Sequence, residues 1–152
     1  MAEIRTAHLM TLKLAVAGMQ EIGVTPSGNR RIGLVAGGTF QGERLRGTVL
    51  PGGADWIIMR PDGATTLDVR LVLETDDKAT IGMTYRGMRH GPASVMERLN
   101  RGDQVDASEY YFRTSVAFET AAAKYDWLNR IIAVGTGVRP PEGPIYDIFE
   151  VL

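Results

Sequence analysis

Cysteine is absent from the 152 residues of this chain. Without thiols the protein can form neither disulfides nor thiolate nucleophiles, and sulfur cannot ligate zinc or an iron–sulfur cluster. A dominant charge is absent too, because 17 basic and 18 acidic side chains leave a formal net charge of -1. Nucleic acids and anionic membranes attract strongly basic surfaces, so we expect neither as a partner.

Long apolar segments are missing as well. The most apolar part of the N-terminal region, Leu9 to Met19, is interrupted by Thr11 and Lys13 and is too short to span a bilayer. No separate basic segment precedes it, as one does in a secretory signal peptide. We therefore interpret this region as a strand and expect a cytoplasmic protein.

The sequence also lacks the motifs of several enzyme classes. His8 and His90 lie far apart, and neither belongs to an HxxxH or HExxH pair, so no metal site is predicted. No serine stands in GxSxG, and the glycines of GLVAGG and VGTGVR do not form GxGxxG between a strand and a helix. The sequence therefore predicts neither a nucleophile elbow nor a dinucleotide site, and we expect no cofactor.

Alternation of polar and apolar residues is abundant, together with 18 glycines and 7 prolines. Successive side chains of a strand point to opposite faces, so this alternation is typical of strands with one buried face. About nine such segments follow one another at roughly 8–15-residue spacing, separated by turns such as PGGA and PDGA. Residues 92–106 differ, because Val95, Met96 and Leu99 have the spacing of a short helix.

These patterns predict an all-β protein with one domain over residues 1–152. The expected architecture is a closed, mostly antiparallel β-barrel of about 8–10 strands with one or two short helices. Closure removes exposed sheet edges, and glycine-rich strands suit the curvature of a barrel wall.

The strand that contains YYFRTSVAFET carries charges within an aromatic sequence. Its alternation places Arg113 and Glu119 on the same face as Tyr111. The segment LDVRLVLET repeats the pattern, with Asp68 and Arg70 on one face and leucine and valine on the other. The charged faces either meet solvent, with cross-strand ion pairs worth about 0.2–1 kcal/mol each, or line a cavity for an apolar ligand. The residues alone leave both interpretations open.

The sequence GGADW contains a second candidate site, Asp55 followed by Trp56. One interpretation is a turn aspartate followed by a core tryptophan. The other is an acid at the rim of a cavity, with an aromatic wall for a planar ligand. Both interpretations remain open on the sequence.

The segments GGADW, LDVRLVLETDD, YYFRTSVAFET and YDWLN, in this order, resemble the DUF3237 (UPF0311) family of small bacterial proteins. The resemblance implies a closed barrel of mostly antiparallel strands, and it names no activity because the family is uncharacterised. It favours the cavity interpretation for Asp68, Arg70 and Arg113, and leaves Glu119 open. For Asn129 in YDWLN we expect a structural role, with the amide binding backbone groups.

The leading hypothesis for function is a cofactor-independent enzyme that catalyses proton transfer on a small aromatic or apolar carbonyl compound. The reaction would be an isomerisation, a cyclisation or a lyase step. Asp55 or Asp68 would be the general base, and Arg113 would neutralise an enolate or carboxylate. The expected catalytic residues are Asp55, Asp68, Arg113 and Tyr85, and the expected substrate-binding residues are Trp56, Arg70, Tyr111 and Glu119.

Two other functions remain open. A lipocalin-like barrel would bind a small molecule without chemistry, and substitution of Asp55 or Asp68 by asparagine would then spare its affinity. A structural subunit would use an apolar outer face to assemble. The sequence leaves the oligomeric state open, with a homodimer as one option.

Overall fold

The computed structural model describes residues 2–152. This part of the chain folds into nine strands with three short helical segments. The strands are β1 (Thr6–Thr25), β2 (Gly28–Gln41), β3 (Arg46–Val49), β4 (Ala54–Met59), β5 (Thr65–Thr75), β6 (Thr80–His90), β7 (Tyr111–Thr120), β8 (Ala133–Val138) and β9 (Ile145–Val151). The helical segments are α1 (Ala93–Asn100) and the 3-10 helices η1 (Ala107–Glu109) and η2 (Ala123–Arg130).

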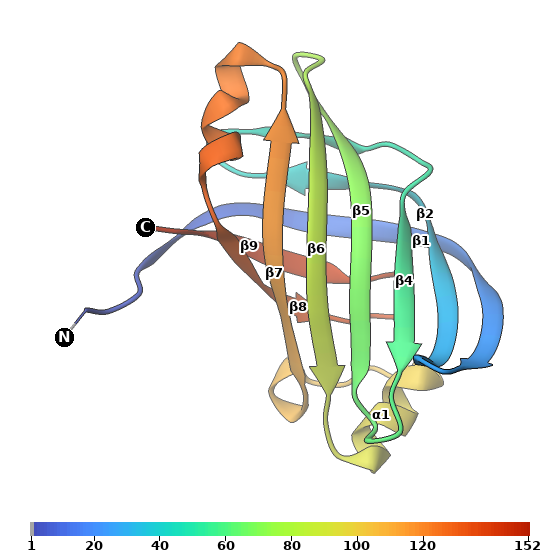
Figure 1. Ribbon diagram of the computed structural model, residues 1–152. Coiled ribbons are helices and arrows are strands. Elements are labelled where there is room, and N and C mark those ends of the chain that lie inside the picture. Colours follow the sequence, from blue (N-terminus) through green and yellow to red (C-terminus); the bar gives the residue numbers. More distant parts are fainter. Residues whose placement is uncertain (1) are drawn as a thin grey trace.

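The strands close into a ring. Their hydrogen-bonded order is β1-β9-β8-β7-β6-β5-β3-β2-β4, and the additional pairings β1–β2 and β5–β4 complete the circuit. Each of these pairings is antiparallel. Figure 1 shows β4 to β7 side by side as one wall, with β1, β8 and β9 crossing behind them and α1 at the lower end. The predicted fold class, an all-β closed antiparallel arrangement with short helices, is confirmed.

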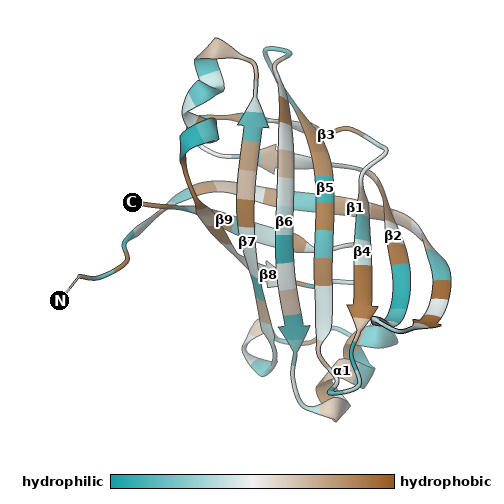
Figure 2. Cartoon of the chain, viewed as in Figure 1, coloured by the Kyte–Doolittle hydropathy of each residue, from teal (hydrophilic) through white to brown (hydrophobic). Residues whose placement is uncertain are grey.

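The core lies inside this ring and is built by alternation. On β5 the leucine and valine side chains at Leu67, Val69 and Leu71 are buried, whereas the residues between them are exposed. Figure 2 shows the result as bands of opposite hydropathy along β5 and its neighbours. Burial of each such side chain contributes about 1.5–3 kcal/mol, so the inward phase of every strand is strongly favoured.

Two helical segments connect the strands at opposite ends of the β4–β7 wall (Figure 1). Helix α1 buries Val95 and Leu99 against the core, in agreement with the predicted short helix. After β7, the side-chain amide of Asn129 in η2 accepts a hydrogen bond from the Thr120 backbone N–H at 2.8 Å and donates one to the Thr120 carbonyl at 3.0 Å. This is the structural role expected for Asn129. No helix in residues 2–152 is long and apolar enough to cross a membrane.

Candidate functional site

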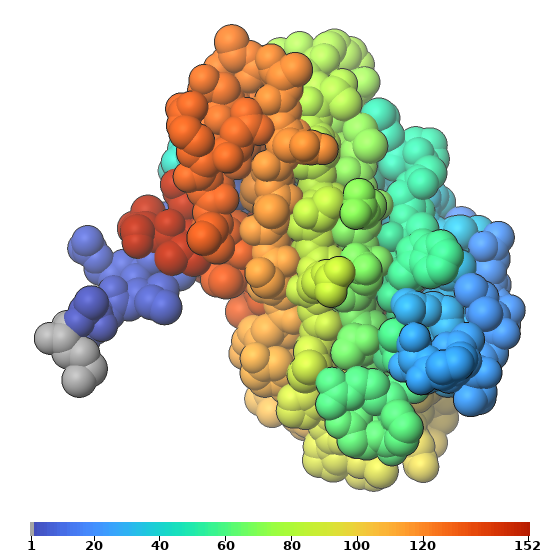
Figure 3. All heavy atoms as spheres, in the orientation of Figure 1, coloured from blue at the N-terminus to red at the C-terminus, as the bar shows by residue number. Residues whose placement is uncertain are grey.

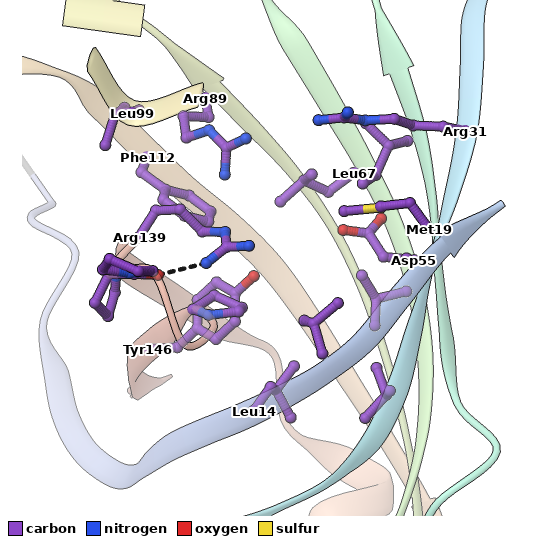
Figure 4. A pocket seen from close by; sticks show the side chains of 18 of the residues that line it. Leu14, Met19, Arg31, Asp55, Leu67, Arg89, Leu99, Phe112, Arg139 and Tyr146 are labelled. Carbon is purple, nitrogen blue, oxygen red and sulfur yellow. Dashed lines mark hydrogen bonds between the residues drawn. The ribbon is translucent and has the colours of Figure 1, made fainter. Parts of the chain in front are cut away.

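A cavity of about 280 Å³ lies inside the ring, towards the end at which α1 sits. Its walls come from both sides of the ring, from α1 and from the loop between β8 and β9. Most lining side chains are apolar, as in typical small-molecule sites. The charged and hydroxylated side chains among them are Asp55, Tyr85, Arg31, Arg89, Arg139 and Tyr146. Figure 4 shows five of these side chains in place, all but Tyr85.

Strand register brings the first of these side chains together. Asp55 on β4 pairs with Val69 on β5, and Val69 pairs with Tyr85 on β6. Residues that are directly opposite across a sheet share a face, so Asp55 and Tyr85 both point inward. Arg89 follows Tyr85 by four residues on the same strand, and strand period 2 therefore gives it the same inward direction.

Asp55 is the one carboxylate among the cavity-lining residues of the described chain. Its Oδ1 accepts a hydrogen bond from the backbone N–H of Asp68 at 3.2 Å. Burial raises the pKa of the Asp55 carboxyl from 3.8 to about 6, and the Asp68 N–H and the Arg89 charge offset only part of that rise. A carboxyl with a pKa near neutral pH can both take and return a proton under physiological conditions.

Arg89 is the most deeply buried cation of the cavity, with 8% of its surface exposed. Its guanidinium carbon lies 5.3 Å from the centre of the Phe112 ring. Burial lowers the pKa of Arg89, and the neighbouring charge of Arg139 lowers it further. An arginine nevertheless stays charged in proteins, so its charge must be balanced by some other group.

Arg139 stands at the start of the loop between β8 and β9, and Figure 4 shows it beside Arg89. Its backbone N–H donates to the Tyr110 hydroxyl at 2.9 Å, and its guanidinium donates to the carbonyl of Pro140. Burial lowers the pKa of Arg139 as well. The two arginines therefore place neighbouring guanidinium groups in a partly dry environment.

Two tyrosines complete the polar lining. The rings of Tyr85 and Tyr146 meet edge to face with their centroids 5.1 Å apart, and both side chains are buried. Burial raises the pKa of both hydroxyls. They therefore remain protonated at neutral pH and can donate hydrogen bonds to a ligand.

The charged faces of β5 and β7 lie outside the cavity, in contrast to the interpretation that the resemblance favoured for Asp68, Arg70 and Arg113. These three side chains are exposed, as is Glu119, because the apolar residues that alternate with them fill the core. The carboxylate of Asp68 is 3.9 Å from the guanidinium of Arg86 on the neighbouring strand. Figure 3 shows this wall from outside, with the side chains of β5, β6 and β7 next to one another.

The two aromatic residues expected to bind substrate, Trp56 and Tyr111, also lie on the surface. Trp56 is 48% exposed, and the guanidinium carbon of Arg30 lies 5.7 Å from the centre of its ring. Tyr111 and Arg113 line an open depression on the outer face of β6, β7 and β8, separate from the cavity. Of the eight residues predicted for the site, the structure therefore brings only Asp55 and Tyr85 together in the cavity.

Sequence reasoning missed Arg31, Arg89, Arg139 and Tyr146. Arg89 could have been found, because it shares the alternation phase of the buried residues of β6 (Ile81, Met83 and Tyr85). Arg139 follows β8 within the sequence RPPEGP, where no periodicity exists to show its direction. In residues 2–152, no three histidine, aspartate or glutamate side chains come together as metal ligands do.

Residues 4–151 match the family model described as "Protein of unknown function (DUF3237)". The chain belongs to the DUF3237 family. Within it, the chain is 35% identical over 149 residues to a UPF0311 protein of Rhodopseudomonas palustris, which covers 98% of this chain and 97% of that protein. A UPF0311 protein of Clostridium acetobutylicum is 36% identical over 124 residues, or 82% of this chain and 78% of that protein.

Solved structures of similar proteins have the same fold. A beta-barrel like protein from Acinetobacter baumannii is 38% identical with a TM-score of 0.87, over 100% of this chain and 98% of that one. A conserved protein of unknown function from Rhodopseudomonas palustris is 34% identical with a TM-score of 0.94, over 100% and 99%. A more distant structure, an enzyme from Penicillium herquei, has a TM-score of 0.76 at 20% identity, over 100% and 97%.

Proposed function

We propose that this protein is a cofactor-independent enzyme that transfers a proton on a small aromatic or apolar carbonyl compound bound inside the ring. The reaction class is isomerisation, cyclisation or a lyase step. The cavity of about 280 Å³ is close to the lower end of the range of about 300–1,000 Å³ that is usual for small-molecule sites. A compound of one or two rings is therefore the expected substrate size.

The observation that carries this proposal is the position of Asp55 in the cavity, together with its raised pKa. The Asp55 carboxyl is the one acid among the described residues that line a largely apolar cavity, and burial raises its pKa to about 6. A strongly perturbed acid in a concave, largely apolar site is more typical of an active site than of a structural ion pair. The hydrogen bond from the Asp68 N–H holds the carboxylate in a fixed place on β4.

In the proposed reaction Asp55 removes a proton from a carbon next to the substrate carbonyl. The electron pair of the broken C–H bond moves onto the carbonyl oxygen, which becomes an enolate. Arg89 and Arg139 supply positive charge, and the protonated hydroxyl of Tyr85 supplies a hydrogen bond. Such donors in a dry site stabilise a developing oxyanion by several kcal/mol. In an isomerisation, Asp55 then returns the proton to another carbon as the carbonyl re-forms. In a lyase step, the enolate electron pair breaks the bond to a leaving group, which leaves with that bond's electron pair and takes the proton from Asp55. In a cyclisation, the enolate carbon attacks an electrophilic carbon of the same molecule, and the group displaced from that carbon takes the proton.

The Penicillium herquei protein is described as an enzyme, so a ring of this fold is compatible with catalysis. The competing function is a lipocalin-like carrier, for which the enclosed cavity alone would suffice. The two functions differ in their need for Asp55. A carrier keeps its ligand when Asp55 becomes asparagine, whereas the enzyme loses its base.

The test is hydrogen–deuterium exchange at carbon. Small aromatic ketones, enones and lactones are incubated with the protein in D₂O, and loss of the signal of the proton next to the carbonyl is followed by ¹H NMR. We expect the wild type to accelerate exchange of at least one scaffold, and Asp55→Asn to slow it by about 10²–10⁴-fold, the usual contribution of a general base.

Asp68→Asn is the comparison variant, because Asp68 was the other candidate base and its side chain lies on the outer face. It should retain the exchange rate of the wild type. Retained exchange in Asp55→Asn would contradict the proposal. Tight binding of a scaffold by both proteins with no exchange in either would instead identify a carrier.

A further inference from the structure

The charges of the cavity do not balance. Three guanidinium groups line it (Arg31, Arg89 and Arg139), against the single carboxylate of Asp55. Among residues 2–152, neither Arg89 nor Arg139 forms an ion pair with a carboxylate. Arg31 has only a distant partner, Glu21, whose carboxylate is 3.8 Å away and largely exposed.

Unpaired buried cations are rare, because removal of a charge from water is costly unless a partner of opposite charge replaces the water. Arg89 is 92% buried, since its exposed fraction is 8%, and its Nε has no hydrogen-bond partner in the described chain. The Nε of Arg31 is likewise buried without a partner. Both side chains therefore carry a buried N–H donor that no group of the described chain accepts.

Asp55 does not serve as the missing counter-ion. No ion pair joins it to any of the three arginines in the described residues, and one carboxylate could not balance three guanidinium groups. Figure 4 shows Arg89 and Arg139 together on one side of the cavity, with Asp55 and Met19 on the other. Arg89 and Arg139 lower the pKa of Asp55 through their charge, but burial raises it by more, so the nearby cations do not replace the water that the carboxylate has lost.

We infer that the ligand of this cavity is an anion, a small aromatic or apolar carboxylate whose carboxylate group is bound by Arg89 and Arg139. Guanidinium groups match the planar, bidentate geometry of a carboxylate. The Phe112 ring beside Arg89 suits an aromatic or apolar ligand body. The inference rests on the proposed function in one respect: the carbon next to this carboxylate is the one that Asp55 deprotonates, so the arginines that bind the carboxylate also stabilise the enolate.

Binding of matched acid and amide pairs tests the inference. We would titrate 2-naphthoate and 2-naphthamide, indole-3-acetate and indole-3-acetamide, and phenylacetate and phenylacetamide into the protein by isothermal titration calorimetry at pH 7.5. The members of a pair have nearly equal size and differ in charge. We expect at least one acid to bind at least about tenfold more tightly than its amide, as charge-assisted hydrogen bonds predict.

The variants are Arg89→Met, with Arg139→Met as a second case, and Arg86→Met as the matched control. Arg86 is on the same strand as Arg89 but its side chain is 84% exposed on the outer face. We expect both cavity variants to weaken acid binding at least about tenfold and to leave amide binding unchanged. Arg86→Met should bind like the wild type.

Because a buried substitution can disturb folding, the wild type provides a second measurement. In ¹H–¹⁵N spectra, the Nε–H resonance of Arg89 should shift when 2-naphthoate is added and stay in place with 2-naphthamide. Amides that bind as tightly as acids would overturn the inference. So would the absence of a shift at Arg89 with every acid of the panel.

The same titrations in Asp55→Asn separate this inference from the proposed function. If acids bind through Arg89 but no compound exchanges its proton in the D₂O experiment, the inference of an anionic ligand stands and the proposed enzyme activity is wrong. If neutral ketones exchange their proton in a way that depends on Asp55 and no acid binds, the proposed enzyme activity stands and the inference of an anionic ligand is wrong.

Discussion

At the scale of single residues, Asp55 is a group whose ionisation opposes folding. Its pKa is about 6 in the folded protein, against an ordinary value of 3.8. Between these two values the folded chain holds a proton that the unfolded chain has lost. The free energy of unfolding therefore falls as the pH rises through this range, by on the order of 3 kcal/mol for a shift of about two pKa units.

Asp55→Asn should accordingly be more stable than the wild type at pH 7.5, and the difference should shrink towards zero as the pH falls to about 4. The amide oxygen can still accept the hydrogen bond from the Asp68 N–H, so the local geometry is kept. Urea unfolding at pH 4.5, 6 and 7.5 measures the effect, with Asp68→Asn as the exposed control. An asparagine variant that is less stable than the wild type at pH 7.5 would show that Asp55 is not desolvated.

At the scale of elements, alternation predicted the strands and the ring well. It shows which residues share a face, as it did for Asp68 and Arg70, but not whether that face meets water or a cavity. The apolar face of β5 decides the matter, because Leu67 and Val69 bury more apolar surface than the charged face can. Only the pairing of β4 with β5, and of β5 with β6, shows that Asp55 and Tyr85 point into the same interior.

The connection between β7 and η2 depends on Asn129, which makes two hydrogen bonds to the backbone of Thr120. Asn129→Ala removes both and should lower the free energy of unfolding by roughly 1–2 kcal/mol. Thermal unfolding of this variant is compared with that of Asp126→Ala, an exposed position in the same segment whose ion pair with Arg130 spans 3.8 Å. Equal stability of the two variants would mean that the Asn129 amide does not stabilise the connection between β7 and η2.

At the scale of the whole molecule, the ring brings charges from distant parts of the sequence to one interior. Arg31 comes from β2, Asp55 from β4, Arg89 from β6 and Arg139 from the segment after β8. No window of the sequence contains this set, so periodicity could not reveal it. The excess of positive charge inside the ring arises only when β1 pairs with both β2 and β9 and closes the circuit.

Such an interior couples ligand binding to the protonation of Asp55. The other charged groups that line the cavity, Arg31, Arg89 and Arg139, keep their charge at every pH of the test, and the two tyrosines stay neutral because burial raises their pKa values. An anionic ligand is repelled by ionised Asp55 and not by its protonated form. A bound carboxylate must therefore raise the pKa of Asp55 further, by linkage.

The affinity of the wild type for 2-naphthoate should rise by at least about fivefold as the pH falls from 8 to 5.5, through the pKa of Asp55 near 6. Asp55→Asn should bind the acid with the tighter affinity at every pH, because it lacks the opposing charge. Isothermal titration calorimetry over this range measures both proteins, with 2-naphthamide as the neutral ligand whose affinity should not vary. An equal pH dependence in wild type and Asp55→Asn would show that another group, and not Asp55, faces the bound anion.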